Sequence, residues 1–454
     1  MLALIPLFVI AVTGSISLFH EELQPWTRPE LRRPAAEGTP SADAALAGVL
    51  PEIPEDVQRI NLRYPSEYAP LLRMDWRAEG DEDSTRRAFD PATGQRLGEP
   101  SSKLSSVLFR WHFLAPLPQG LLLAGLISLF WLALTISGVY LHRKKLLAQF
   151  RLSGWRKRRG RALQSWMHTL AATITLPFHL LYGVTGALFG SLLFLGPMIL
   201  YLVFGGDQEA MEALVEGAQP PKQELAEETL DALPSLDPFV ADAEARFVGM
   251  HASFVSLVEP YDEAARLSVF VMDAGDARGN VVYDLHRGME PVHLVPPDLD
   301  NPVLDIVTPV IELHFAQLGG YPVRFLYLVL GVMLAVLIYA GARMWVMRQR
   351  TVAPRAAAAC ERLFDGFGFG LLPAIGVFAW ANRLLPADLG ARAQVEENVF
   401  HAVWVLVGLA VLVRGTGPAT RRAMAMAAAV LLATVPLLDG LLHGMWPWSP
   451  SAWH

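Results

Sequence analysis

Two histidines lie inside one long apolar stretch of the chain, and the neutral imidazole side chain is a common ligand of transition metals. The stretch GRALQSWMHTLAATITLPFHLLYGVTGALFG runs from Gly160 to Gly190 and contains His168 and His179. An imidazole is costly in hydrocarbon unless it has a partner, so both side chains are candidates for a functional site. In one straight helix they would lie about 20° apart around the axis and ~16 Å apart along it. Two histidines placed one above the other on the same helix face suit two stacked haem groups, each of which has a second histidine ligand from a neighbouring helix.

Three more histidines stand at the ends of predicted membrane segments and are the candidate partners. His142 ends the second predicted span near the cytoplasmic surface, at the depth of His168. His112 and His314 precede the second and fourth spans near the outer surface, and His179 lies more than halfway towards it. These depths allow an inner haem site from His142 and His168, and an outer one from His179 with either His314 or His112. The structural alternatives are hydrogen-bonded histidines within the helix packing, interfacial histidines beside aromatic residues, and a basic flank for His142.

The other histidines are not expected to act as ligands. His401 and His443 are expected to be structural or interfacial. Five more are expected to be solvated: His20, His251, His286, His293 and His454. A single divalent metal is a competing hypothesis, to which Glu312 beside His314 could add a carboxylate. Zinc requires about four ligands that converge on one point, and histidines spread over both membrane faces do not converge.

The composition indicates a polytopic membrane protein. Of the 454 residues 53% are hydrophobic and 18% are charged, whereas roughly a quarter are charged in soluble proteins. About 20 apolar residues suffice to cross a bilayer. The sequence contains seven such segments: Met1–Phe19, Gly120–Leu141, Met167–Phe189, Pro322–Val346, Phe367–Ala381, Val399–Val413 and Ala423–Leu442. The single cysteine, Cys360, excludes disulfides, c-type haem attachment and cysteine-ligated iron–sulfur clusters.

Basic residues indicate the orientation of the spans. The loop after the second span is rich in lysine and arginine and has no acidic residue, and the loops after the fourth and sixth spans are also basic. By the positive-inside rule these loops face the cytoplasm, so the long segments 20–111 and 205–311 lie on the other side. The predicted divisions are a first span 1–19, a first outer module 20–111, a second span 112–145, a basic cytoplasmic loop 146–162, a third span 163–204, a second outer module 205–311, a fourth span 312–350 and a three-helix extension 351–454.

The first four spans form two tandem repeats in the sequence. The stretches AVTGSISLF, WHFLAPLPQG and TISGVYLHRKK correspond to GVTGALFG, LHFAQLGGYP and IYAGARMW, which makes His112 and His314 equivalent. The first half has no counterpart of His168, so we expect the first helix to begin upstream of Met1. In the third span, Pro177 is expected to kink the helix just before His179.

The two outer segments also resemble each other. Alternating apolar and polar residues predict a hairpin over Phe254–Asp273. Ala88–Glu99 and Val281–Val292 share a pattern of strand, turn and strand. The segment Arg28–Pro54, rich in Pro, Ala and Glu, is expected to be a loop. We therefore expect two small α+β modules outside the membrane.

At these motifs the chain resembles the PepSY-associated transmembrane helix family, whose bacterial members include iron-regulated inner-membrane proteins and ferric-siderophore reductases. The resemblance rests on TISGVYLHRKK, WMHTLAATITLPFHLLYGVTGALF, LHFAQLGGYP and the paired outer modules, and covers roughly Met1 to Arg350. It implies PepSY-like modules outside the bacterial inner membrane and one or two haem b groups between the helices. The predicted fold is a mostly α, polytopic membrane helix bundle of about seven spans with two small α+β PepSY-like extracytoplasmic modules.

The predicted function is that of an oxidoreductase, a b-type haem protein that passes electrons across the inner membrane to a ferric siderophore or other ferric chelate in the periplasm. The candidate haem ligands are His112, His142, His168, His179 and His314. The electron donor is undefined, a quinol being one candidate. Membrane lipid is the other expected partner, and no nucleic acid is expected.

Two other classes of protein compete with this interpretation. One is a non-enzymatic, membrane-anchored PepSY module that binds a periplasmic partner or peptidase, with histidines that only form hydrogen bonds. The other is a metal permease. Cation pathways usually contain several intramembrane carboxylates, and only Asp439 qualifies here.

Overall fold

The computed structural model divides into two compact units. The helical unit comprises Met1–Leu23, Ser102–Leu202 and Val307–Trp453, and the sheet unit comprises Gln24–Ser101 and Val203–Ile306. Most of the predicted basic loop, together with His286 and His454, lies outside the described residues. The described residues are 1–28, 39–66, 71–78, 84–98, 102–145, 159–208, 233, 235–273, 278–285, 287–297, 302–444 and 446, without the side chains of 192–199, 202–203 and 302–307.

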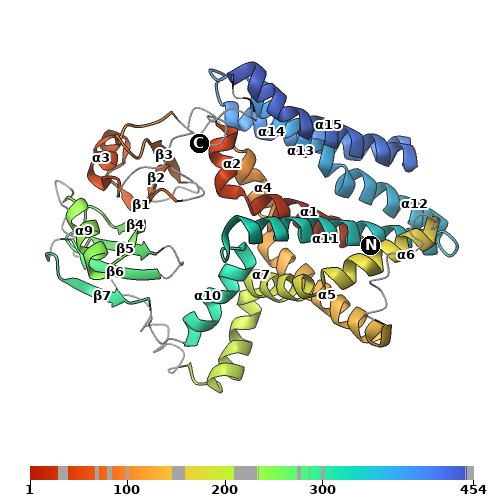
Figure 1. Cartoon of the computed structure of the whole chain (residues 1–454), viewed down its shortest axis with the longest axis horizontal. Coiled ribbons are helices and arrows are strands. Elements are labelled where there is room, and N and C mark those ends of the chain that lie inside the picture. Colours follow the sequence, from red (N-terminus) through yellow and green to blue (C-terminus); the bar gives the residue numbers. More distant parts are fainter. Residues whose placement is uncertain are drawn as a thin grey trace. The chain divides into compact units, whose positions relative to one another are not determined.

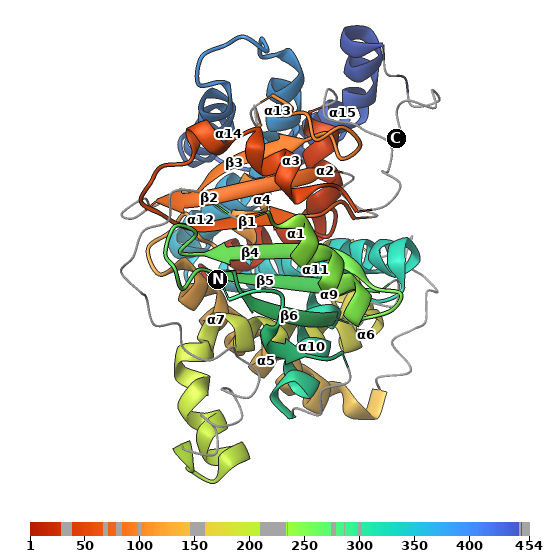
Figure 2. The same ribbon diagram turned by 90° about the vertical axis from the view of Figure 1, so that its left-hand side faces the viewer.

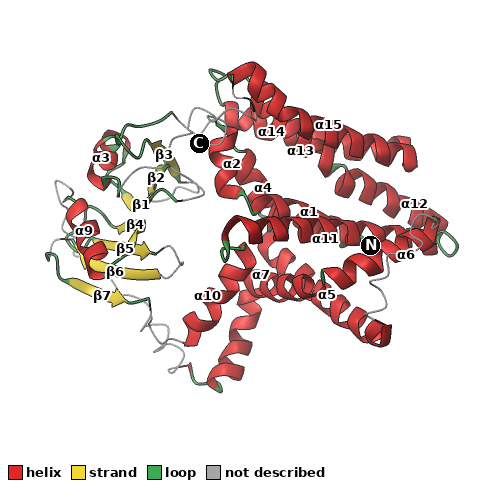
Figure 3. Cartoon of the chain, in the orientation of Figure 1, coloured by secondary structure: helices red, strands yellow, loops and turns green. Residues whose placement is uncertain are grey.

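Helices make up the described part of the helical unit (Figures 1 and 3). They are α1 (Leu4–Ser17), α4 (Leu104–His112), α5 (Gly120–His142), α6 (Gly160–Ile174), α7 (Leu176–Phe204), α10 (Pro302–Phe315), α11 (Gly320–Gln349), α12 (Pro354–Leu363), the π-helical η6 (Phe364–Phe369), α13 (Leu371–Leu384), α14 (Arg392–Arg414) and α15 (Pro418–His443). Among the described residues five helices are long and apolar enough to cross a membrane, and up to seven if two bent pairs each count as one span. The prediction of a multi-pass helical membrane protein is confirmed.

Both bent pairs break a predicted span. The helix α1 is followed by α2 (His20–Thr27) at an angle of 71°, and α6 is followed by α7 at 73°. The second break falls at Thr175, two residues before Pro177, whose ring and missing N–H favour the first turn of a new helix. The predicted kink is confirmed. The straight-helix stripe of His168 and His179 is wrong, because the two histidines lie on separate helices.

Small residues let the helices approach closely. An added Cβ at Gly125 of α5 would overlap the backbone of Gly190 in α7, so the two helices cross at this pair of glycines. The long helix α11 packs against α1, α6 and α12. This packing brings elements of both sequence repeats together around α1 and α11.

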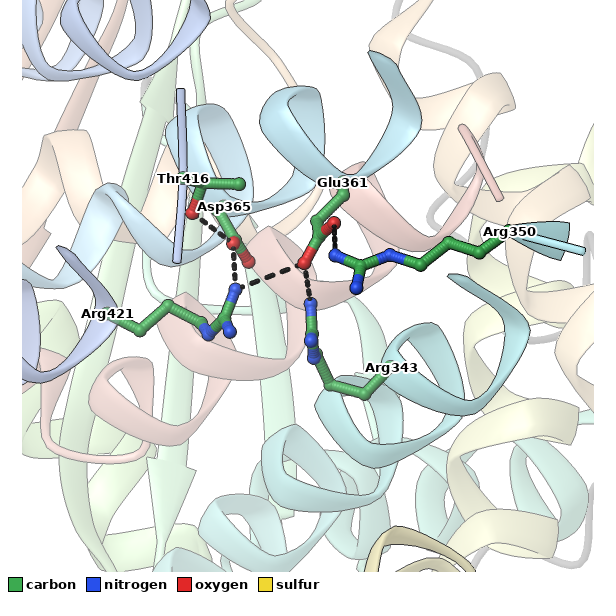
Figure 4. A network of polar contacts seen from close by, with 6 residues as sticks. All are labelled: Arg343, Arg350, Glu361, Asp365, Thr416 and Arg421. Atoms are coloured by element: carbon green, nitrogen blue, oxygen red, sulfur yellow. Dashed lines mark hydrogen bonds and ion pairs between the residues drawn. The ribbon is translucent and has the colours of Figure 1, made fainter. Parts of the chain in front are cut away.

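A buried ionic cluster joins α11 to the C-terminal helices (Figure 4). The Glu361 carboxylate of α12 accepts hydrogen bonds from Arg343 and from Arg350, the latter at 2.5 Å, and its Oε1 lies 3.3 Å from Nη1 of Arg421. Arg421 of α15 also donates to Oδ2 of Asp365 at 2.6 Å, and Thr416 donates to the same oxygen at 2.5 Å. The cluster therefore ties the C-terminal extension to the fourth predicted span.

The sheet unit contains one antiparallel sheet to which both outer segments contribute. Its strands are β1 (Val57–Arg63), β2 (Leu72–Ala78), β3 (Thr85–Phe89), β4 (His251–Val258), β5 (Arg266–Met272), β6 (Arg278–Asp284) and β7 (Pro291–Val295). Their order across the sheet is β3-β2-β1-β4-β5-β6-β7, so β1 and β4 join the two segments edge to edge (Figure 2). The expectation of two separate α+β modules is therefore wrong, because both segments share one sheet and one hydrophobic core. The predicted hairpin is β4–β5, and the predicted pattern at Val281–Val292 forms β6 and β7.

Two short helices cover one face of the sheet, α3 (Ala42–Ala47) and α9 (Asp237–Arg246). They cap each other, because Asp237 accepts from the backbone N–H of Ala42 at 2.7 Å and Asp43 accepts from that of Leu236 at 2.6 Å. The prediction of a loop over Arg28–Pro54 is thus wrong for its described second half. Ser41 caps α3 by accepting from the N–H of Ala44 at 3.0 Å, and the sequence ADAALA consists mostly of strong helix formers.

A charged network fastens α9 to the sheet. Tyr283 of β6 and Arg246 of α9 both donate to Oδ2 of Asp242, at 2.7 and 2.6 Å. Burial by itself would raise the pKa of Asp242, but the hydrogen bonds from Arg246 and Tyr283 hold that pKa below its usual value. Burial and the Asp242 carboxylate raise the pKa of Tyr283. The tyrosine therefore stays protonated and keeps its hydrogen bond at neutral pH.

Candidate functional site

His112 and His314, the two histidines made equivalent by the sequence repeat, face each other within the helical unit. Their ring centroids are 6.0 Å apart. His112 ends α4, and His314 lies in the last turn of α10. Two residues beyond each histidine stands a buried residue with positive φ, Leu114 at 57° and Ala316 at 52°. The same left-handed turn therefore ends both helices and leads into the following span, α5 or α11.

The hydrogen bonds to these two rings determine which nitrogen of each carries the proton. Nδ1 of His112 lies 3.0 Å from the carbonyl oxygen of Ile10, which can only accept, so this nitrogen is the donor. Nδ1 of His314 lies 2.7 Å from Oγ1 of Thr185, whose own hydroxyl proton goes to the carbonyl of Leu181 at 2.9 Å. His314 therefore donates through Nδ1 as well.

Both rings consequently carry a lone pair on Nε2. No hydrogen bond to either Nε2 is found among the described residues, and both side chains line the same cavity. A histidine that donates from Nδ1 to a carbonyl or hydroxyl oxygen and offers Nε2 is the usual arrangement of a metal-ligating imidazole. The two imidazoles therefore share the tautomer that a metal-ligating histidine has.

The cavity between them has a volume of about 340 Å³ and an apolar lining. Aromatic side chains contribute much of this lining: Phe109, Phe113, Trp131, Phe178, Tyr182, Phe189, Phe315 and Tyr327. Small residues on α1, α7 and α11 complete it: Ala11, Gly14, Ser15, Gly186, Gly190 and Gly331. A flat apolar group suits such a site, because aromatic rings can pack on its faces while glycines leave room for it.

Gly14 is essential for the position of His112. A Cβ at Gly14 would lie only 2.5 Å from both Cε1 and Nδ1 of the His112 ring. The equivalent glycine of the second repeat, Gly186, faces the Ser128 side chain, with 2.7 Å from its added Cβ to Oγ. Glycine at position 14 thus allows the imidazole to lie directly against α1.

His314 is held by a second contact through its backbone. The Tyr182 hydroxyl donates to the His314 carbonyl at 3.0 Å, and the two rings lie with centroids 5.0 Å apart. Phe189 meets the His314 ring edge-on, also at 5.0 Å. The sequence indicated Thr185 and Gly186 only as small residues that allow close helix packing, and the roles of Tyr182 and Thr185 emerge only from the structure.

His168 has the same hydrogen-bonding pattern at a second position. Its Nδ1 lies 3.1 Å from the carbonyl oxygen of Leu337 in α11, so Nδ1 donates and Nε2 carries the lone pair. A Cβ at Gly341 would lie 3.3 Å from the His168 ring, so a glycine again borders the imidazole. His142, its predicted partner, is exposed at the end of α5.

His179 has different surroundings from the other four. It is buried on α7, its Nε2 contacts Oγ1 of Thr175, and its ring lies 5.0 Å from that of Trp131. It is not among the residues that line the cavity of His112 and His314. The sequence allowed His179 to pair with either of those two, whereas the structure brings those two together with each other.

The remaining predictions concern His401 and metal clusters. His401 accepts a hydrogen bond at Nε2 from the Trp111 indole N–H at 3.0 Å, which is a structural contact between α4 and α14. In the part of the chain that the structure describes, no group of three or more His, Cys, Asp or Glu side chains could hold a metal ion. This observation gives no support to a zinc-type site at Glu312.

The fold and the site define a multi-pass membrane protein with a histidine-lined apolar cavity. A family model described as the PepSY-associated TM region matches residues 1–348. The chain therefore belongs to the PepSY-associated transmembrane family, as its sequence motifs predicted. It is also similar to "Uncharacterized protein PA4219" of Pseudomonas aeruginosa strain PAO1, with 29% identity over 345 residues that cover 72% of this chain and 85% of that protein.

Proposed function

We propose that the protein is an inner-membrane b-type cytochrome that passes electrons to a ferric chelate in the periplasm. The observation that carries this proposal is the pair His112 and His314, whose two Nε2 lone pairs are available in one apolar cavity. An iron ion about 2 Å from each of two imidazole nitrogens separates the ring centres by about 6 Å. The 6.0 Å between the two ring centroids is compatible with this value.

The surroundings of the two rings support haem rather than a bare ion. The lining is apolar and aromatic, and a naked divalent cation would need charged or further polar ligands there. When bound, haem b supplies one-electron transfer through its iron. His112 and His314 would hold it, and Thr185 and the Ile10 carbonyl would keep both rings in the ligating tautomer. The aromatic lining would exclude water.

A second haem is proposed at His168, with His142 as its partner, as the sequence suggested. His168 has its Nε2 available and borders Gly341 on α11. His179 is proposed to stabilise the α6–α7 bend through its contact with Thr175 instead of ligating haem.

The overall reaction balances with a two-electron donor. One quinol gives up two electrons and two protons and becomes a quinone, and two ferric ions each accept one electron to become ferrous. Hard oxygen ligands hold iron(III) far more tightly than iron(II), so reduction weakens the chelate. The chain's part is to ligate, space and insulate the redox groups.

A reconstituted system tests this function. The full chain in liposomes, reduced from within by a quinol, is mixed with an external ferric chelate, and the iron(II) formed is captured by a ferrous-specific dye. We expect dye formation by the wild type and by His443→Ala, a change at an exposed histidine of α15, and little by His314→Ala. Equal rates in all three proteins would contradict the proposal and favour the membrane-anchored binding module.

A further inference from the structure

The sheet has a second face, opposite α3 and α9, and this face is rich in arginine. In antiparallel pairing, directly opposed residues point to the same side of the sheet. The register opposes Arg59 to Arg77 and Arg63 to Arg73, and it places Arg266 opposite Val258, which is itself opposite Arg59. The arginines on this face, which we call the arginine face, are Arg59, Arg63, Arg73, Arg77, Arg86, Arg266 and Arg278.

The arginine face has far more positive than negative charge. Its acidic residues are Asp75, opposite Asn61, and Asp284, opposite Arg266. Two of its cross-strand pairs are arginine opposite arginine, and like charges in direct opposition destabilise a sheet. In one of these pairs Nε of Arg63 lies 4.0 Å from Oδ1 of Asp75, and Arg73 donates to Oε1 of Gln24 at 3.0 Å. For the other pair, Arg59 and Arg77, the described residues show no counter-ion. Arg59, Arg77 and Arg86 are exposed. The Arg59–Arg77 pair is therefore the feature that indicates an anionic ligand.

Other side chains on this face hold part of it in place. Asn61 donates to Oδ2 of Asp75 at 3.0 Å and accepts from the Ser256 hydroxyl at 2.9 Å. Arg266 donates to Asp284 at 3.1 Å. The centre of the face is thus a connected polar network across β2, β1 and β4.

Aromatic rings lie next to these arginines. Phe254 and Phe270 are directly opposed on β4 and β5, with ring centroids 5.6 Å apart. The guanidinium of Arg63 lies over the Phe254 ring at 4.9 Å from its centroid. The face therefore offers planar donors for anionic oxygens beside an aromatic surface, a combination that matches a ligand with aromatic rings and several negatively charged oxygens.

We propose that the arginine face binds an anionic, aromatic ferric chelate of the tris-catecholate class. This assignment rests on the proposed function, since it names the substrate that the redox groups would reduce. The described strands contain no lysine, and a surface that only attracts anionic lipid would be served by lysine equally well. Arginine instead provides paired N–H donors for the paired oxygens of a catecholate.

Gallium(III) complexes test binding independently of electron transfer, because gallium(III) is not reduced under these conditions. The full chain is placed in nanodiscs of phosphatidylcholine, and its affinity is measured for a trianionic gallium tris-catecholate and for a cationic gallium trihydroxamate. The variant is the triple change Arg59→Gln, Arg63→Gln and Arg77→Gln. The matched control is Arg246→Gln on α9, which lies on the other side of the sheet.

We expect the wild type and Arg246→Gln to bind the tris-catecholate in a salt-dependent manner and to ignore the trihydroxamate. The triple variant should lose about tenfold or more in affinity for the tris-catecholate. The triple variant relieves the opposition of Arg59 and Arg77 but also loses the contacts of Arg63 with Phe254 and Asp75, so its unfolding temperature without chelate should change little. Arg63→Lys keeps the positive charge but loses the planar pair of guanidinium N–H donors. This second, milder variant should bind the tris-catecholate more weakly than the wild type does.

Three results would overturn the proposal. The first is that the triple variant binds the tris-catecholate as tightly as the wild type does. The second is that the wild type binds the anionic and the cationic gallium complex equally well. The third is that the triple variant loses affinity only for phosphatidylglycerol vesicles and not for the tris-catecholate. The last result would assign the face to lipid headgroups. Absence of haem with intact gallium binding would instead refute the proposed redox function and leave the anion site standing.

Discussion

The substitution Gly14→Ala tests how closely His112 is placed against α1. The new methyl group would lie 2.5 Å from Cε1 and Nδ1 of the ring, whereas ordinary contact begins at 3.4 Å. The imidazole must therefore move by about 1 Å. Overpacking of this kind costs about 1–3 kcal/mol. Losing the hydrogen bond from Nδ1 to the Ile10 carbonyl costs about 1 kcal/mol more.

Together these costs amount to about 2–4 kcal/mol, which corresponds to a loss on the order of 10²-fold in affinity for a group that His112 ligates. The assay is the haem content of the purified protein, measured as a pyridine haemochrome, together with its unfolding temperature. Gly138→Ala is the matched control, because Gly138 is also helical and no atom lies within 4 Å of its added Cβ. Gly341→Ala should have an intermediate effect, since its Cβ would lie 3.3 Å from the His168 ring.

If Gly14→Ala retains the same haem content and visible spectrum as Gly138→Ala, then His112 does not need a glycine at position 14 to ligate haem. A loss of haem by both variants to the same degree would also contradict the prediction, because the effect would then arise from helix packing in general. Unfolding temperatures separate these cases from a simple loss of folding.

Three further predictions concern the ligand support, the extension and the sheet unit. Thr185→Val, which removes the acceptor for Nδ1–H of His314 at nearly constant volume, should weaken haem binding about 10–100-fold in a haem titration; an unchanged affinity would refute the tautomer argument. Glu361→Ala leaves Arg343 without the carboxylate of Glu361, while Arg421 keeps Asp365, and should destabilise the helical unit by ~3 kcal/mol in a denaturant titration; a change below about 1 kcal/mol would show that the cluster is solvated. The lowered pKa of Asp242 stabilises the sheet unit above its unfolded pKa of about 3.9, and this contribution is lost as the pH falls through the lower folded value. Asp242→Asn should flatten that acid dependence of the unfolding temperature, and a curve parallel to the wild type would contradict the assignment.

The sequence was sufficient to predict the helical class, the hairpins and the family. Apolar length identifies spans directly, and period-two alternation predicted β4–β5 because one face of that hairpin is buried. The repeat even predicted the equivalence of His112 and His314, since both precede the same kind of turn. Local patterns of this kind predict structure correctly because each depends only on a short stretch of chain.

Tertiary pairing was less accessible from the sequence. The depth of a residue in the membrane could not distinguish His179 from His112 as the neighbour of His314. Depth does not determine the direction in which the His179 side chain points, and the bend at Thr175 changes that direction. The roles of Thr185 and the Ile10 carbonyl depend on contacts across more than a hundred residues. The pairing of β1 with β4, which extends the arginine face over both outer segments, joins strands that are still further apart in the chain.

The most direct test of the account is a dithionite-reduced-minus-oxidised visible spectrum of the purified full chain, with a haem count, for the wild type, His112→Ala and His314→Ala. We expect the sharp α-band of low-spin b-type haem in the wild type, and the loss of at least one haem per chain in each variant. A featureless wild-type spectrum from haem-replete cells, or an unchanged haem count in both variants, would contradict the account.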